Sequence, residues 1–289
     1  MESRKIAVVV SATMLLTGCT TVATPPSSTN GGSAIVGHIH ELVSSESDGS
    51  LLVATHEGLH RLSVDPDGSA IAVGPLGDLD FDPMGFTIAD GTAYASGHPG
   101  PTTPDSFGAP NLGLITSTDG AETWTNISLT GVTDFHALAV MSSGAELPQV
   151  FGLDPGNPRI QRSTDGGRTW RDGAELVARD ILVVGTRLYA TTSEGLAISE
   201  DGGMTFTLDP AAPALYLVAA DRQGTLAGID TTGTLWTRSP GQDWNQGGTV
   251  SGTPQAVAAD GARIFVADDR GIAFTEDAGA TWVVLEVRG

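Results

Sequence analysis

The sequence contains a single cysteine and few basic residues. Cys19 is the only cysteine among 289 residues, so no disulfide can form within one chain. Lysine and arginine total 14 against 34 aspartates and glutamates, which gives a formal net charge of −20 at pH 7. Such an acidic surface repels nucleic acid and favours cationic partners or metal ions. We therefore expect a protein that does not bind nucleic acid.

Several well-defined catalytic motifs are also missing. The sequence has no Gly-rich phosphate loop, no dinucleotide-binding fingerprint, no Gly-x-Ser-x-Gly elbow and no cysteine-based metal site. The acidic run at residues 78–82 lacks the glycine spacing of an EF-hand calcium loop.

Only one apolar run is long enough to suggest targeting, and it lies near the N-terminus. Arg4 and Lys5 precede the apolar residues 6–16, a segment too short to span a bilayer and typical of a secretory signal. It leads into LTGC at residues 16–19, which resembles the lipobox of bacterial lipoproteins. The resemblance implies a signal peptide over residues 1–18 and a lipidated Cys19. It also implies attachment to the lipid bilayer at the extracytoplasmic face of the cell membrane.

Composition changes again after the cysteine. Residues 20–32 are rich in Thr, Ser, Pro and Gly and cannot bury an apolar core, so we expect a flexible tether over residues 19–34. The remaining residues, 35–289, have the length of one large all-β domain.

An eight-residue frame recurs along this domain. It reads STDGGRTW at residues 163–170, with copies at 117–124, 199–206 and 275–282 and a shortened echo at 239–244. The aromatic residues that end these frames are spaced by 46, 36, 38 and 38 residues. A regular period of this size marks a repeat architecture, and its length suits one four-stranded blade per repeat.

The frame has a physical interpretation as a hairpin. An Asp at the third position can accept backbone N–H groups of the same turn, and the glycines tolerate positive φ. The Thr and the aromatic residue then begin the return strand. We therefore predict a structural role for Asp119 and Trp124, Asp165 and Trp170, Asp201 and Phe206, and Asp277 and Trp282.

This frame resembles the Asp-box, or BNR repeat, of sialidases, sortilin-type receptors and photosystem assembly factors. The copy at residues 163–170 matches fully, whereas Ala121 replaces a glycine in another copy and Phe206 replaces Trp in a third. The resemblance implies a β-propeller. We predict an all-β, six-bladed propeller, with seven blades as the alternative. The predicted blades cover residues 37–76, 84–129, 136–173, 180–208, 216–250 and 255–287.

A closer resemblance covers nearly all of the predicted mature chain. Blocks between residues 38 and 136 are similar to a group of secreted Gram-positive lipoproteins described as glycosylhydrolase-like BNR proteins. These blocks are residues 38–42, 54–59, 84–87, 96–99, 111–115 and 134–138. The description of that group follows its propeller fold, and a fold does not carry an activity with it.

The histidines are confined to the first half of the predicted domain. In a propeller, the start of strand A and the end of strand B meet at one face, opposite the Asp-box hairpins. We therefore expect a ligand-binding group on that face. The six histidines are His38, His40, His56, His60, His98 and His136, and the predicted ligand-binding residues are His40, His56, His98 and His136.

Clustered imidazoles suit Zn²⁺ or Cu²⁺, with Glu57, Asp105 or Asp134 as further ligands. Acid–base chemistry and a purely structural role stay open as alternatives. The predicted metal ligands are His38, His40, His98 and His136. Alignment of the blades places His40, Gly85, His136, Asp180, Tyr216 and Gln255 at equivalent positions around the channel mouth.

Enzymatic activity is the second hypothesis. Sialidases use three converging arginines and a Tyr–Glu pair, yet the first blade offers only Arg61 and the chain contains no Arg-Ile-Pro element. Other glycoside hydrolases need two suitably spaced carboxylates. The catalytic candidates are Asp180, Glu41, Asp134 and Tyr216. The sequence thus favours a binding or assembly module for an unidentified extracellular ligand or protein partner, with a glycoside hydrolase as the alternative.

Overall fold

The computed structural model describes residues 37–289 apart from 46–47, 143 and 145–146. The predicted signal segment, Cys19 and the tether lie outside the described residues. Within the part of the chain that is described, no helix has the length and hydropathy of a membrane span.

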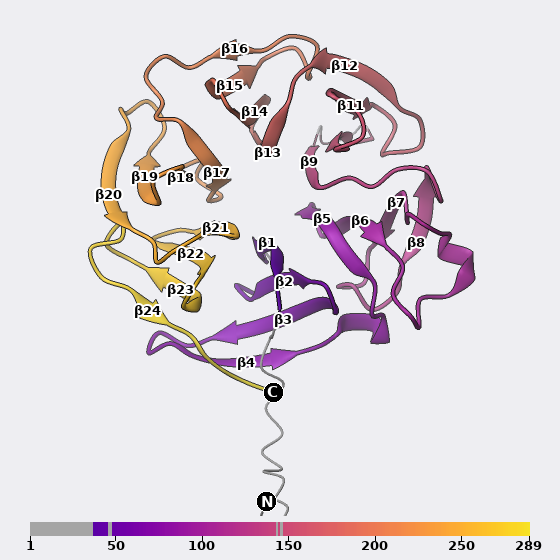
Figure 1. The fold of residues 1–289 in the computed structure, drawn as a ribbon, viewed down its shortest axis with the longest axis horizontal. Coiled ribbons are helices and arrows are strands. Elements are labelled where there is room, and N and C mark those ends of the chain that lie inside the picture. Colours follow the sequence, from indigo (N-terminus) through magenta and orange to yellow (C-terminus); the bar gives the residue numbers. More distant parts are fainter. Residues whose placement is uncertain (1–36, 46–47, 143, 145–146) are drawn as a thin grey trace, which may run out of the picture. The chain divides into compact units, whose positions relative to one another are not determined.

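Six antiparallel sheets surround a central channel (Figure 1), so the prediction of a six-bladed β-propeller is confirmed. In each blade the strands follow one another outward from the channel. Blade 1 contains β1 (Ile39–Ser44), β2 (Leu51–Thr55), β3 (Gly58–Val64) and β4 (Ser69–Val73). Blade 2 contains β5 (Asp82–Ala89), β6 (Thr92–His98), β7 (Leu114–Ser117) and β8 (Thr125–Ser128). Blade 3 contains β9 (Ala137–Met141), β10 (Gln149–Leu153), β11 (Arg159–Ser163) and β12 (Arg171–Glu175).

The second half of the ring repeats this order. Blade 4 contains β13 (Ala178–Val184), β14 (Arg187–Thr192), β15 (Gly195–Ser199) and β16 (Thr207–Leu208). Blade 5 contains β17 (Leu215–Ala220), β18 (Leu226–Asp230), β19 (Thr234–Arg238) and β20 (Asn245–Thr249). Blade 6 contains β21 (Ala256–Asp260), β22 (Arg263–Asp268), β23 (Gly271–Thr275) and β24 (Val283–Val284). Two short 3-10 helices, η1 (Leu76–Asp78) and η2 (Asp105–Phe107), lie in connections.

The apolar core lies between neighbouring blades. The second strand of a blade is covered on both faces, and all five residues of β2 are buried. One cluster joins blade 1 to blade 6 and includes Val53, Leu62, Phe265 and Phe274. Because each blade buries its faces against its neighbours, the ring and not the single blade is the stable unit.

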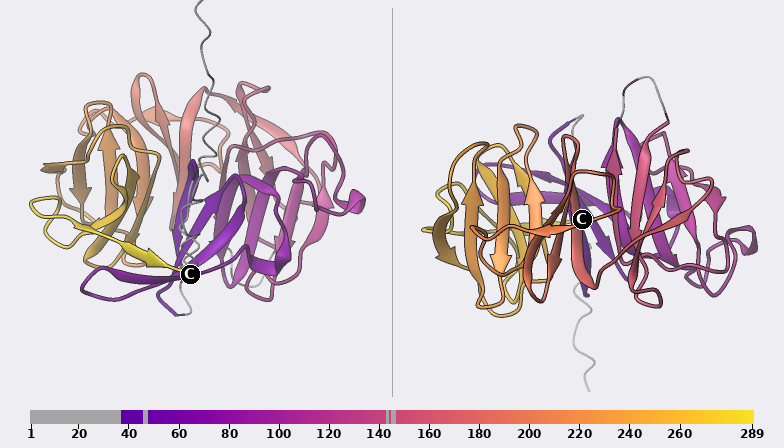
Figure 2. Two further views of the ribbon diagram at one scale, coloured as in Figure 1. Left: turned by 60° about the horizontal axis from the view of Figure 1, so that its bottom comes forward. Right: turned by 90° about the horizontal axis from the view of Figure 1, so that it is seen from above.

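The ring is closed by the C-terminal strand, which the sequence did not predict. The expected sixth blade extended to residue 287, but β24 ends at Val284 and the chain then crosses to blade 1 (Figure 2). There β25 (Glu286–Arg288) pairs in parallel with β4, with Glu286 opposite Ser69. The prediction was wrong here because only the assembled ring brings the free edge of β4 beside the C-terminus.

Each complete Asp-box is a hydrogen-bonded hairpin between the third and fourth strands of its blade. In blade 3, Asp165 Oδ1 accepts the Thr169 N–H at 2.9 Å and the Ser163 hydroxyl at 2.7 Å, and Oδ2 accepts the Thr169 hydroxyl at 2.6 Å. The equivalent hydrogen bonds from Thr and Ser or Thr groups hold the pKa of Asp119 and Asp277 down to about 2. These aspartates therefore stay ionised and are fully used within their own turns.

Candidate functional site

The inner strands begin with a β-bulge at the face opposite the Asp-boxes. In blades 1, 2, 4 and 5, the pairing of the first strand with the second skips one residue of the first strand. In blades 3 and 6, the residue just before the first strand donates its backbone N–H to the second strand. The equivalent residues are therefore His40, Met84, His136, Arg179, Tyr216 and Gln255. The predicted alignment was wrong by one residue at Gly85 and Asp180, because a bulge inserts a residue that periodicity cannot reveal.

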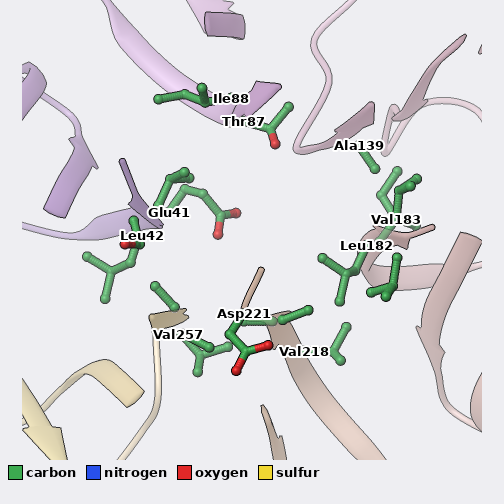
Figure 3. A pocket seen from close by; sticks show the side chains of 18 of the residues that line it. Glu41, Leu42, Thr87, Ile88, Ala139, Leu182, Val183, Val218, Asp221 and Val257 are labelled. Atoms are coloured by element: carbon green, nitrogen blue, oxygen red, sulfur yellow. The ribbon is translucent and has the colours of Figure 1, made fainter. Parts of the chain in front are cut away.

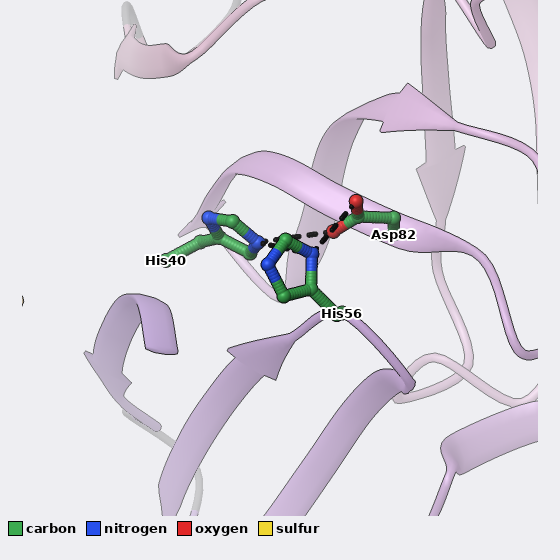
Figure 4. A group of neighbouring side chains, drawn as sticks. All are labelled: His40, His56 and Asp82. Atoms are coloured by element: carbon green, nitrogen blue, oxygen red, sulfur yellow. Dashed lines mark hydrogen bonds and ion pairs between the residues drawn. The ribbon is translucent and has the colours of Figure 1, made fainter. Parts of the chain in front are cut away.

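A compact group of two histidines and one aspartate bridges blades 1 and 2 at this face (Figure 4). His40 occupies the bulge of β1, His56 directly follows β2, and Asp82 opens β5. His40 Nε2 lies 3.0 Å from Asp82 Oδ1, and His56 Nδ1 lies 3.0 Å from Asp82 Oδ2. The two imidazole nitrogens are 3.2 Å apart.

This geometry is suited to a metal ion. In a tetrahedral site with ligand bonds of about 2.0–2.1 Å, the ligand atoms are about 3.3 Å from one another. His56 Nδ1 is hydrogen-bonded to Asp82 Oδ2, whereas the buried Asp82 Oδ1, 3.0 Å from His40 Nε2, has no hydrogen-bond partner among the described residues. A cation would satisfy it. The side chain of His40 is 6% exposed and that of His56 is 51% exposed, so the group lies at the surface with one side open.

The structure divides the predicted metal ligands between two groups. His40 belongs to the first group, whereas His98 and His136 contact Asp134 in a cluster that does not bring three donor atoms within metal-binding distance of one another. The His38 ring contacts the first group, with its centroid 5.0 Å from that of His40. Burial, followed by the charges of neighbouring histidines, lowers the pKa of His38.

Sequence reasoning missed Asp82 as a ligand. The acidic run at residues 78–82 lacks the spacing of a calcium loop, and Glu57, Asp105 and Asp134 were the carboxylates expected near the histidines. The available signal was positional, because Asp82 stands two residues before the bulge of its blade, as Asp134 does before His136. His60 is buried beside Gly74 in blade 1 and lies apart from both groups.

The central channel holds a second set of predicted residues. A cavity of about 550 Å³ is lined by the inner strands of the propeller, and the carboxyl group of Glu41 points into it (Figure 3). Asp180 lines the same cavity from blade 4. Of the four catalytic candidates, the structure thus brings two together. Asp134 instead contacts histidines, and the Tyr216 hydroxyl accepts a hydrogen bond from Arg179 Nε at 3.1 Å.

The channel wall shifts the protonation of both carboxyls. Burial raises the pKa of Asp180 to about 6, although its Oδ2 accepts the Val218 N–H at 3.0 Å. Burial, and then the charge of Asp180, raises the pKa of Glu41 well above its usual range. The nearby Arg179 opposes both shifts.

Replacing Asp180 with Asn is expected to stabilise the protein above about pH 6. The folded pKa of about 6 exceeds the unfolded value of roughly 3.9, so the folded state binds more protons and stability falls as the pH rises through this window. Asn removes the charge and can still accept the Val218 N–H. In thermal melts at pH 7.5, the melting temperature of the variant should be a few degrees above that of the wild type, since each kcal/mol of stability raises it by about 2–4 °C. At pH 4 the two melting temperatures should be equal. The control is Asp243→Asn at an exposed position. If Asp180→Asn melted at a lower temperature than the wild type at pH 7.5, the expectation would be contradicted.

Comparison with known proteins establishes the fold but no family. No family model and no curated protein matches the chain. Membership of the lipoprotein group that the sequence resembles therefore stays a prediction. Among solved structures, a chain of a nidogen/laminin complex is similar with a TM-score of 0.61 and 16% identity, and the match covers 81% of this chain and 93% of that one. A GH74 enzyme from Niastella koreensis is similar with a TM-score of 0.57 and 17% identity, over 87% of this chain and 45% of that one. PorZ, a surface component of the type-IX secretion system of Porphyromonas gingivalis, is similar with a TM-score of 0.56 and 14% identity, over 86% of this chain and 32% of that one. At these identities the likeness is one of fold alone.

Proposed function

We propose that this chain is an extracytoplasmic binding module, anchored to the membrane through Cys19, that binds its ligand through a metal ion held by His40, His56 and Asp82. The observation that carries the proposal is that one donor atom from each of His40, His56 and Asp82 lies within 4.8 Å of the other two. The two imidazole nitrogens are 3.2 Å apart, and each lies 3.0 Å from one of the two oxygens of the Asp82 carboxylate. Three protein ligands leave one tetrahedral position for a ligand from solution. The exposure of His56 is consistent with access to that position.

A bound metal ion would also allow this acidic protein to bind an anionic ligand. The chain carries a formal net charge of −20, which disfavours anionic ligands over most of its surface. A bound divalent cation is the largest local charge in its surroundings and reverses this preference within a few ångströms. We therefore propose that the ligand or protein partner presents an anionic or lone-pair donor to the metal. Two imidazoles and a carboxylate suit Zn²⁺ and Cu²⁺.

The decisive experiment is titration of the metal-free folded protein with Zn²⁺ and with Cu²⁺ by calorimetry. We expect saturable binding that weakens at least about 100-fold in His56→Ala and in Asp82→Asn, since both remove a direct ligand. Glu57→Gln is the matched control, because Glu57 is an exposed neighbour of His56 outside the group. Absence of binding in the wild type, or equal binding by His56→Ala, would overturn the proposal.

A glycoside hydrolase is the second candidate, and the pairing of Glu41 with Asp180 in the channel favours it. The raised pKa of Asp180, about 6, suits a general acid near neutral pH. Turnover of chromogenic glycosides that is lost in Asp180→Asn would support this candidate over the binding module. No turnover across a broad panel of such substrates would eliminate it.

A further inference from the structure

We infer that a groove between blades 4 and 5, beside the Asp-box hairpins, is a binding site for a neutral saccharide. The groove has a volume of about 820 Å³ and is lined by the Asp-box of blade 4 and by the shortened hairpin of blade 5, residues 239–244. Small-molecule sites have volumes of about 300–1,000 Å³. None of His40, His56 and Asp82 lines the groove, so the inference does not depend on the proposed function.

A repeated hydrogen bond joins the blades at four other junctions. The donor lies on the outer side of one blade, four residues after the aromatic residue that ends its frame. The acceptor is a backbone carbonyl in the hairpin between the third and fourth strands of the next blade, at 2.5–2.9 Å. The four pairs are Ser128 with Gly167, Ala174 with Gly203, Gly248 with Ala278, and Glu286 with Gly68. Each of these hairpins is thereby held against the preceding blade.

The junction between blades 4 and 5 cannot form this hydrogen bond. The equivalent residue of blade 4 is Pro210, which has no N–H to donate. The hairpin of blade 5 is also shorter than a complete Asp-box, with six residues in place of eight. A Cβ at Gly203 would lie 3.3 Å from Ile160 of the preceding blade, whereas a Cβ at Gly241 would meet nothing within 4 Å. The proline suits the shortened hairpin, because a donor at this position would be left without its carbonyl.

The charged side chains that line the groove are already paired. Arg187 Nη2 lies 2.8 Å from Glu200 Oε1, and Arg238 Nη1 lies 2.6 Å from Asp209 Oδ2. The carboxylate of Asp201 accepts hydrogen bonds within its own Asp-box. A groove whose charges are used in this way favours a neutral ligand over a free anion or cation.

The remaining polar groups of the groove both donate and accept hydrogen bonds. Gln223, Ser239 and Gln242 are exposed, and their side chains have no hydrogen-bond partner among the described residues. Side-chain amides and hydroxyls offer donors and acceptors together, as the hydroxyls of a sugar require. Tyr189 and Leu226 are buried and form an apolar floor on which the C–H groups of a sugar ring can pack. An uncharged ring that carries hydroxyl groups matches both features.

Binding to a microarray of neutral, acidic and amino-bearing glycans, in the presence of EDTA, tests the inference. We expect the wild type to bind neutral glycans, and calorimetry with the oligosaccharide bound most strongly then gives the affinity. Joint Gln223→Ala and Gln242→Ala substitutions should weaken binding at least about tenfold, since they remove two hydrogen-bonding groups. Gln246→Ala is the matched control, because Gln246 is exposed on β20 and does not line the groove.

A second variant fills the groove. Replacing residues 239–244 with STDGGRTW, the complete frame of residues 163–170, should abolish glycan binding while the protein still melts cooperatively. Retained binding in this folded variant, a preference for charged glycans, or no glycan binding by the wild type would each overturn the inference. These results leave the proposed metal site untouched, because the titrations with Zn²⁺ and Cu²⁺ measure it separately.

Discussion

Gly97→Ala is expected to lower stability strongly and to weaken metal binding by His40, His56 and Asp82. Gly97 has φ 146°, and a Cβ there would overlap the Asp82 carbonyl oxygen and lie 2.8 Å from the Met84 nitrogen. Both obstacles are backbone atoms, so no side-chain rotation can relieve the clash. Backbone strain and overpacking each cost about 1–3 kcal/mol, which predicts a loss of roughly 2–6 kcal/mol.

The same contact explains the effect on metal binding. Gly97 allows β6 to approach β5 closely beside Asp82, a ligand in the proposed metal site. Thermal melts and metal stoichiometry measure the two effects. Gly91→Ala is the matched control, because Gly91 also has positive φ but a Cβ there would meet nothing within 4 Å. Equal melting temperatures for the two variants would refute the expectation.

Phe135→Ala is expected to lower the free energy of unfolding by about 3–5 kcal/mol and to loosen the contacts of Asp134 with His98 and His136. The Phe135 side chain is fully buried, and its ring lies 4.8 Å from that of Trp170, centroid to centroid. Gly152 leaves the space that the ring fills. Removing the ring leaves a cavity and frees the backbone that aims Asp134 and His136.

A second buried phenylalanine serves as the comparison. Phe151 is also fully buried in blade 3 but belongs to a different core cluster. Phe151→Ala should lower the free energy of unfolding in urea by a similar amount. An unchanged free energy of unfolding in Phe135→Ala would contradict the expectation.

The repeat frame made most of the fold predictable. The predicted bounds of blade 1, residues 37–76, enclose β1 to β4, which together span residues 39–73. The agreement arises because turn chemistry and alternating burial are local properties, visible in a short window of sequence. Bulges are different, since they depend on how a strand pairs, and they displaced the predicted alignment at Met84 and Arg179.

The candidate site, too, was predictable from the sequence only in part. Composition and topology placed the histidines at one face, but residue spacing could not show that Asp82 joins His40 and His56. It also could not show that His98 and His136 share Asp134. These contacts cross from one blade to the next, so their geometry depends on the twist and packing of two sheets.

The sequence alone determined the repeated four-stranded blade and its Asp-box hairpins, since both follow from short repeated patterns of Asp, Gly, Thr and aromatic residues, and it favoured six blades over seven. Tertiary structure decided which carboxylate meets which imidazole, that Glu41 and Asp180 face one channel, and that β25 closes the ring on β4. Those outcomes depend on distances between residues far apart in the chain. Only closure of the whole ring sets such distances.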